Sequence, residues 1–261
     1  MVRRVGATVL AVVAAIAGVA AIAGVAAIVG ADFSRPVAAQ QPAGRRGGGP
    51  PQAARQAAPI DITGYWVAYV TEDWRFRMMT PPKGDYTRVP LTPEGRKVAD
   101  GWDPKADEAA GNQCKTYGAG GIMRVPGRLH ITWQDDNSLK VDVDAGTQTR
   151  VLHFTSSAPP AERTWQGHSM AQWDVPAKSL KMSTTNFRAG YLRRNGVPYS
   201  ENATITEYVD VAPHPEGGQL LVVTTMVEDP RYLQRPFIVS SHFKQEKDGA
   251  RWNPQPCVAV W

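Results

Sequence analysis

The sequence predicts an all-β domain that closes as an antiparallel, up-and-down barrel and contains one or two short helices. After residue 60, short runs rich in β-branched and aromatic residues recur at close intervals, separated by turn-forming residues. Many of these runs alternate apolar with polar residues, which is the period of a strand that buries one face. A β-sandwich is the alternative architecture.

The N-terminal residues have the pattern of a targeting segment. Arg3 and Arg4 precede an uncharged run from Val5 to Ala31, and small residues at positions 37–39 offer a cleavage site. We therefore predict a signal peptide over residues 1–39. The alternative is an uncleaved membrane anchor, because the run is long enough to span a bilayer. Under both interpretations the domain is exported to the periplasm or secreted. Membrane contact is expected only if the segment is an uncleaved anchor.

Residues 40–60 are predicted to form a disordered linker, and residues 61–261 a single β domain. The linker is rich in Gly, Pro, Ala and Gln and has no hydrophobic period. The formal net charge of the chain is +5, but several arginines of the first 60 residues contribute to it. The domain is close to neutral and shows no basic stripe with interleaved aromatic residues, so nucleic acid is not an expected partner.

Cys114 and Cys257 are the only cysteines in the chain. In an exported protein, two cysteines most simply form one disulfide, which would fasten the C-terminal strand to an early connection. The alternative is a pair of free thiols or a catalytic thiol. No neighbouring pattern favours that alternative.

The domain begins with a strand and two short helical segments. Gly64 to Thr71 is aromatic and β-branched, and Glu72 to Met79 either continues this strand or bends away. Thr92 can cap a short helix ending near Asp100, with proline at its first position. Asp103 to Gly121 is expected to be a loop with one helical turn around residues 106–110.

The rest of the domain is expected to be strands. The first two alternate apolar with polar residues, and tight turns join them to each other and to a third strand, which predicts an antiparallel meander. Closing the sheet would remove exposed edges, so we favour a lipocalin-like barrel. Residues 186–200 are expected to be a long polar connection. The expected strands cover residues 129–133, 139–143, 148–154, 170–173, 180–185, 203–211, 219–228 and 237–245, with 256–260 as a candidate closing strand.

Three motifs follow one another in the second half of the chain. They are W-x-G-H-S at residues 165–169, G-x-P-x-S at 196–200 and D-P-x-Y at 229–232. Their order resembles that in a large family of uncharacterised exported bacterial proteins. The resemblance implies export and a lipocalin-like barrel, and it implies no established activity. Ala171 and Tyr199 depart from the family pattern, which has glycine and histidine at these places.

The segment Gly167-His168-Ser169-Met170-Ala171 is similar to the nucleophile elbow of an esterase. That chemistry needs the serine on a turn between a strand and a helix, whereas a short strand and a turn follow here. We therefore interpret His168 and Ser169 as hydrogen-bonded residues at the end of a strand. No metal and no cofactor is predicted, because the five histidines have no zinc-like spacing. A metal site assembled in space from His130, His153 and His168 is the alternative.

The expected function is the binding of a small, partly apolar ligand in the barrel cavity. Such pockets combine aromatic walls with a few polar anchors. Asp144, Arg150 and Glu207 lie on expected strands. Inside a barrel they would have to form ion pairs, and otherwise they point to solvent. The predicted lining consists of Trp74, Arg150, His153, His168, Tyr191 and Glu207, with His168 facing inward.

Two other classes of function stay open. A metal-independent isomerase, hydratase or cyclase could use the same cavity, with His168 and Glu207 as acid and base. A structural envelope protein would instead have a filled core. Residues 193–196 are interpreted as a solvated turn and carry no predicted role.

Overall fold

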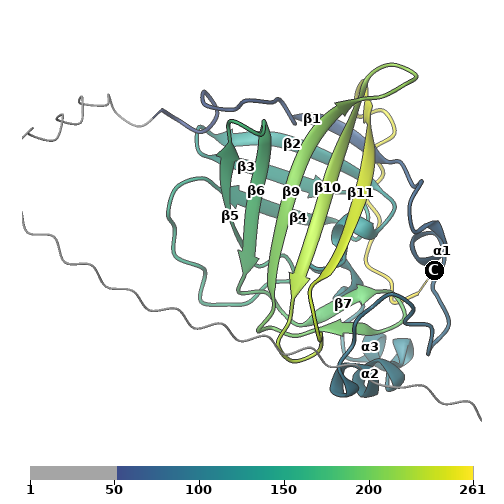
Figure 1. Cartoon of the computed structure of the whole chain (residues 1–261). Helices are drawn as coiled ribbons and strands as arrows, with labels where there is room; N and C mark the ends of the chain where they lie inside the picture. The colour runs from purple at the N-terminus through teal and green to yellow at the C-terminus, as the bar shows by residue number, and fades with distance from the viewer. Residues whose placement is uncertain (1–51, 261) are drawn as a thin grey trace, which may run out of the picture. The chain divides into compact units, whose positions relative to one another are not determined.

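The computed structural model describes residues 52–260. Nine of its strands form a closed barrel (Figure 1). The predicted signal peptide or anchor lies outside the described residues. Within residues 52–260, no helix is long and apolar enough to cross a membrane. The barrel strands are β1 (Gly64–Ala68), β2 (Arg128–Asp135), β3 (Ser138–Val143), β4 (Gln148–His153), β5 (His168–Asp174), β6 (Ser179–Thr185), β9 (Thr204–Pro213), β10 (Gln219–Glu228) and β11 (Phe237–Glu246).

The predicted all-β barrel is confirmed, but one pair of neighbouring strands is parallel. The order around the barrel is β1-β11-β10-β9-β6-β5-β4-β3-β2. Strands β4 and β5 run in the same direction, with Leu152 beside Ser169 and His153 beside Met170. A closed ring with an odd number of strands cannot alternate direction all the way round, so at least one parallel pair is unavoidable. The purely antiparallel prediction is wrong at this pair.

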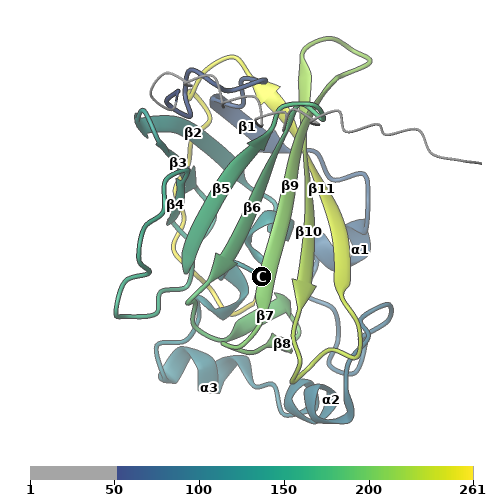
Figure 2. The same cartoon turned by 60° about the vertical axis from the view of Figure 1, so that its left-hand side comes forward.

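The N-terminal part of the described chain covers one end of the barrel. We call this the upper end; it carries the β2–β3 and β5–β6 turns (Figure 2). The Ala54 amide donates to Asn137 Oδ1 at 3.0 Å, and Trp173 Nε1 donates to the Ala54 carbonyl at 2.8 Å. Ile60 packs against the barrel core. Residues 52–60, predicted as linker, therefore belong to the folded part of the chain.

The opposite, lower end is covered by a β-hairpin and by two short helices, α2 and α3, whereas a third, α1, lies beside β11 (Figure 2). The hairpin occupies most of the predicted polar connection 186–200, and Val197 and Tyr199 are fully buried in it. The solvated turn predicted at residues 193–196 is also wrong. Asn195 Nδ2 donates to the carbonyls of Pro82 and Asp85, both at 3.0 Å. The elements outside the barrel strands are α1 (Trp74–Arg77), α2 (Pro93–Asp100), α3 (Pro104–Ala109), the 3-10 helices η1 (Lys115–Tyr117) and η2 (Ile122–Arg124), and the hairpin strands β7 (Gly190–Arg193) and β8 (Val197–Tyr199).

The predicted helices and disulfide are confirmed. Thr92 caps α2 by accepting a hydrogen bond from the Gly95 amide at 3.0 Å, and α3 provides the expected helical turn. Cys114 and Cys257 form the disulfide across a sequence separation of 143 residues. The candidate closing strand at residues 256–260 is wrong, because this tail makes a single β-bridge, between Gln255 and Ala145.

Inward side chains of the barrel strands form a buried apolar cluster. Inward positions on β3 are Leu139, Val141 and Val143, as the alternation predicts. Trp66 on β1 is fully buried, and its indole Nε1 donates to the Ile62 carbonyl at 3.0 Å. A second apolar cluster at the lower end joins the hairpin and α2 to the ends of β9, β10 and β11.

Replacing Gly196 with alanine is expected to destabilise the fold by about 2 kcal/mol or more. Gly196 has a φ of 81°, and an added Cβ would lie 2.2 Å from Cβ of Trp102. Gly217→Ala is the matched control, because Gly217 has a φ of 92° and no atom within 4 Å of the added Cβ. Urea unfolding of both variants separates the clash from the backbone strain. Equal losses would contradict the packing argument.

Candidate functional site

An ion pair between Arg150 and Glu207 lies inside the barrel. Arg150 Nη2 on β4 is 2.6 Å from Glu207 Oε2 on β9, and the two side chains are 1% and 0% exposed. Three hydroxyl groups surround the pair. Thr184 Oγ1 accepts from Arg150 at 3.0 Å, Thr225 Oγ1 donates to Glu207 Oε1 at 3.2 Å, and Ser169 Oγ lies 2.8 Å from Thr184 Oγ1. We call these five residues the polar belt.

The polar belt is packed between apolar layers. Leu152 and Met182 lie one inward position above it on β4 and β6, and the hairpin at the lower end supplies Tyr199 below. Burial raises the pKa of the Tyr199 hydroxyl, and the charge of Arg150 partly opposes this. Of the two alternatives for these charged strand residues, an ion pair inside the barrel or exposure to solvent, Arg150 and Glu207 follow the first. Asp144 is also buried, but it sits in the β3–β4 turn, where its carboxylate accepts from the Arg128 amide at 2.6 Å.

His153 and His168 meet on the outer face of the barrel wall. Their rings stack with centroids 5.0 Å apart, and His168 Nε2 lies 3.2 Å from Ser157 Oγ. Burial and the neighbouring His168 lower the pKa of His153. Successive strand residues point to opposite faces. Because Ser169 faces inward, His168 faces outward, away from Glu207. The prediction that His168 faces the barrel interior is therefore wrong.

The third histidine of the possible metal site lies elsewhere. His130 on β2 stacks on Tyr65, with ring centroids 4.0 Å apart. Among residues 52–260, no group of three or more His, Cys, Asp or Glu side chains is arranged to hold a metal ion.

The two remaining predicted lining residues lie on elements outside the nine barrel strands. Trp74 on α1 is 61% exposed. Tyr191 on β7 donates to Asp107 Oδ2 at 2.7 Å, and burial together with this carboxylate strongly raises its pKa. The structure therefore brings together Arg150 with Glu207, and His153 with His168. It does not gather the six predicted residues in one pocket.

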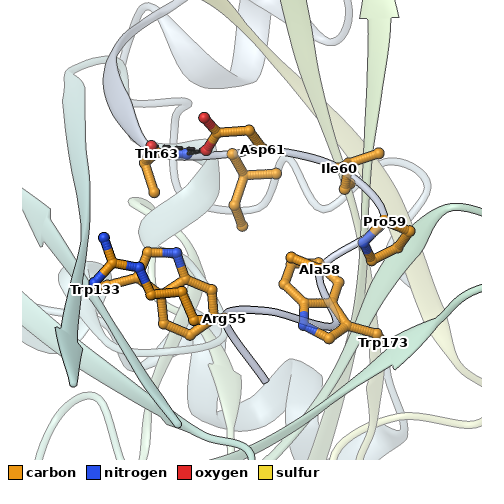
Figure 3. A pocket seen from close by; sticks show the side chains of 9 residues that line it. Arg55, Ala58, Pro59, Ile60, Asp61, Thr63, Trp133 and Trp173 are labelled. Atoms are coloured by element: carbon orange, nitrogen blue, oxygen red, sulfur yellow. Dashed lines mark hydrogen bonds between the residues drawn. The ribbon is translucent and has the colours of Figure 1, made fainter. Parts of the chain in front are cut away.

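A pocket of about 370 Å³ lies at the upper end of the barrel. Figure 3 shows its side chains in a ring, with Trp133 and Trp173 on one side and Asp61 and Thr63 on the other. We call it the aromatic pocket. Its lining is Arg55, Ala58, Pro59, Ile60, Asp61, Ile62, Thr63, Trp133 and Trp173.

The aromatic pocket follows from the strand pattern. Trp133 and Trp173 are the uppermost inward residues of β2 and β5, and both pack against the barrel core. Phe154, just after β4, lies between them, with ring centroids 5.7 Å from Trp133 and 5.3 Å from Trp173. Sequence reasoning missed this row. Three aromatic residues, each at the same end of its strand, were the available signal.

No family model, no curated protein and no solved structure matches this chain. Function is therefore inferred from the chemistry of its own residues.

The polar groups of the aromatic pocket are a cation, a carboxylate and a hydroxyl. Asp61 Oδ1 accepts from the amide and hydroxyl of Thr63 at 2.9 and 2.7 Å, which fixes the carboxylate at the rim. The Arg55 side chain is exposed on the same rim. The opposite charges balance, so the site suits an uncharged or zwitterionic ring system with polar edges.

A second pocket, of about 430 Å³, lies under the C-terminal tail between Tyr117, Val125 and Asp144. Burial raises the pKa of Asp144, and backbone amides of Arg128, Ala145 and Asn253 oppose this shift. These three amides use most of the roughly four acceptor sites of the carboxylate. We therefore interpret Asp144 as the residue that fixes the β3–β4 turn, and favour the aromatic pocket for ligand binding.

Proposed function

We propose that this chain is an exported barrel protein that binds a small, partly apolar molecule in the aromatic pocket. The observation that carries the proposal is the row of Trp133, Phe154 and Trp173 beside a cavity of about 370 Å³. Barrel mouths are common places for ligand sites, and aromatic walls with few polar groups are their usual lining.

The size of the pocket limits the ligand. Drug-sized ligands occupy pockets of roughly 300–1,000 Å³, so a cavity of about 370 Å³ suits one or two fused rings. A flat ring can stack on an indole face, which provides affinity at low entropic cost. The rim residues Arg55 and Asp61 can then bond to polar atoms at the ring edge.

The aromatic pocket lies at the barrel mouth, whereas the sequence predicted a ligand site in the barrel cavity. Fully buried side chains such as Trp66, Leu139 and Leu180 occupy the described interior. Those interior positions offer packing rather than a free surface. The separation of His168 from Glu207 by the barrel wall also removes the support for that acid–base pair.

Export is supported by two independent features. The basic and then apolar N-terminal sequence is typical of a signal peptide, and a disulfide between Cys114 and Cys257 suits an oxidising compartment. The order of the motifs at residues 165–232, which resembles that of exported proteins, agrees with both.

The ligand is sought first by native mass spectrometry of protein purified from its own host, looking for a co-purifying small molecule. Saturation-transfer NMR with indole, quinoline and nicotinamide then tests planar rings directly. Trp173→Leu is expected to weaken binding of the best probe by about tenfold. Circular dichroism in the near ultraviolet shows whether the variant keeps its packed core.

Trp74→Leu is the control. Trp74 is 61% exposed outside the barrel, so this substitution should leave binding unchanged. Equal effects of the two substitutions would contradict a site at the barrel mouth. Absence of any co-purifying molecule and of any probe binding would instead favour the structural role with a filled core.

A further inference from the structure

Three buried arginines lie together, and two of them line a pocket beside the lower half of β11. Arg77, Arg124 and Arg193 are 1%, 6% and 3% exposed. We call them the arginine cluster. Arginine is almost never buried this far unless its charge is paired, so the anions around the cluster decide what it can do.

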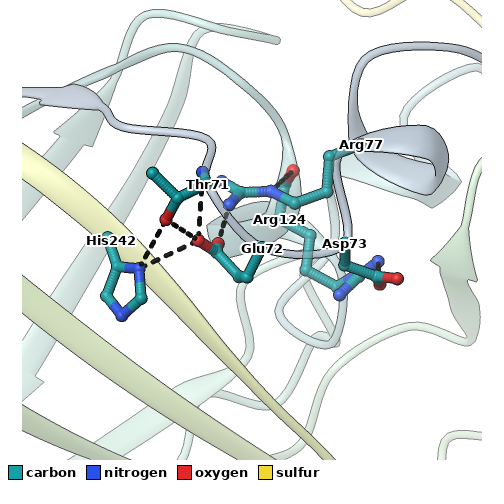
Figure 4. A network of polar contacts seen from close by, with 6 residues as sticks. All are labelled: Thr71, Glu72, Asp73, Arg77, Arg124 and His242. Atoms are coloured by element: carbon teal, nitrogen blue, oxygen red, sulfur yellow. Dashed lines mark hydrogen bonds and ion pairs between the residues drawn. The ribbon is translucent and has the colours of Figure 1, made fainter.

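Two carboxylates lie within the cluster, as Figure 4 shows. Glu72 pairs with Arg77 Nη1 and also lies 2.9 Å from His242 Nδ1. Asp73 Oδ2 accepts from Arg124 Nη2 at 2.5 Å and is 4.0 Å from Arg193 Nη2. Among the described residues, two carboxylates thus serve three guanidinium groups, which leaves an excess of one positive charge.

A third carboxylate, that of Asp85, does not remove this excess of positive charge. Asp85 pairs with Arg75 at 2.7 Å, and Arg75 is an exposed residue outside the cluster. Main-chain carbonyls accept some of the remaining N–H groups. Arg193 Nη1, for example, donates to the Thr87 carbonyl at 2.8 Å. Carbonyl groups satisfy hydrogen bonds, but they carry no net negative charge.

Three guanidinium nitrogens of the cluster are left without a hydrogen-bond partner among the described residues. They are Arg77 Nη2, Arg124 Nη1 and Arg193 Nε. A buried polar group without a partner destabilises the fold, and a charged one does so more strongly. Burial, with the neighbouring charge of Arg124, lowers the pKa of Arg193 to about 10. The cluster is therefore short of anionic groups.

A pocket opens onto two of these nitrogen-bearing side chains. Its volume is about 240 Å³. Its lining consists of the cations Arg88, Arg124 and Arg193, the carboxylates Glu72 and Asp73, and residues 237–240 of β11. Aromatic rings hold the guanidinium groups in place. The Arg193 guanidinium carbon lies 4.0 Å from the centroid of the Phe76 ring, and that of Arg124 lies 5.9 Å from the Phe237 ring.

We propose that this pocket binds an oxyanion, the phosphate, sulfate or carboxylate group of a small ligand, between Arg124 and Arg193. The planar guanidinium group binds such oxygens with paired, charge-assisted hydrogen bonds. An oxyanion would supply the missing negative charge and accept from Arg124 Nη1 and Arg193 Nε. This site is separate from the aromatic pocket, and neither proposal depends on the other.

Isothermal titration calorimetry with sodium phosphate, sulfate, acetate and benzoate tests the proposal, with sodium chloride keeping the ionic strength constant. At least one of the four oxyanions is expected to bind saturably. Phosphate or sulfate binding identifies a free or esterified tetrahedral anion. Binding of benzoate without acetate identifies an organic acid whose ring contacts Phe237. Titrations indistinguishable from chloride for all four would overturn the proposal.

Two substitutions should move the affinity in opposite directions. Arg124→Gln removes a binding group and is expected to weaken binding by about tenfold. Asp73→Asn removes a competing negative charge and is expected to strengthen binding by about fivefold. Asn also tolerates the left-handed backbone of Asp73, whose φ is 51°, so this variant remains informative if Arg124→Gln does not fold.

Arg231→Gln is the charge-matched control, because Arg231 forms an exposed ion pair with Glu94 and does not line the pocket. It should leave the affinity unchanged, as should Trp173→Leu in the aromatic pocket. Weaker or unchanged binding by Asp73→Asn would contradict the assigned site.

Discussion

Replacing Glu207 with alanine is expected to lower the free energy of unfolding by about 3–5 kcal/mol, because it leaves the Arg150 charge buried without its partner. The pair is completely enclosed, and Glu207 is the carboxylate that contacts Arg150, at 2.6 Å. Removing it also deprives Thr225 of an acceptor. The charge cannot move to water, since Arg150 lies between apolar layers of the barrel.

Urea unfolding measures this effect through the transition midpoint at constant slope. Glu94→Ala, which breaks the exposed ion pair with Arg231, serves as control and should shift the midpoint much less. The double variant Arg150→Met with Glu207→Leu should regain most of the loss, because apolar residues of similar volume often replace a buried pair without cost. A double variant as unstable as Glu207→Ala would contradict the unpaired-charge explanation.

Reduction of the Cys114–Cys257 disulfide is expected to lower the free energy of unfolding by about 5 kcal/mol. The sequence separation of 143 residues is large, and in the chain-entropy model a cross-link of this length strongly restricts the unfolded chain. Urea unfolding with and without dithiothreitol gives the value.

The double variant Cys114→Ser, Cys257→Ser is the control, because the chain has two cysteines and the reductant then has no target. The double variant should be as unstable as the reduced protein and indifferent to dithiothreitol. A loss below about 1 kcal/mol would contradict the chain-entropy account and indicate residual structure that already holds the two segments together in the unfolded state.

Elements with a local signal were predictable from the sequence. β10 occupies Gln219–Glu228, as expected from its apolar run, and Thr92 caps α2 as its position predicts. The hairpin in residues 186–200 was not predictable, because its charged residues are typical of a protein surface. Asn195 is buried because it bonds to Pro82 and Asp85, more than a hundred residues earlier. Sequence spacing does not report such distant contacts.

The candidate sites were likewise predictable only where a local pattern determines them. The Arg150–Glu207 pair was one of two alternatives, since strand alternation leaves open which face is buried. The orientation of His168 depended on whether it or Ser169 faces inward, and a shift of one residue reverses that choice. The aromatic pocket required knowing that Trp133, Phe154 and Trp173 lie at the same end of three strands, which the register decides.

The position of β1 in the barrel constrains the order in which this chain can fold as it is made. Tyr65 pairs with His130 on one side and with Glu246 on the other. The first strand therefore keeps an open edge until the last one, β11, has been synthesised. An open edge can pair with a neighbouring chain. Nascent or C-terminally shortened chains expose two such edges, on β1 and β10, so these edges are where premature association between molecules would begin.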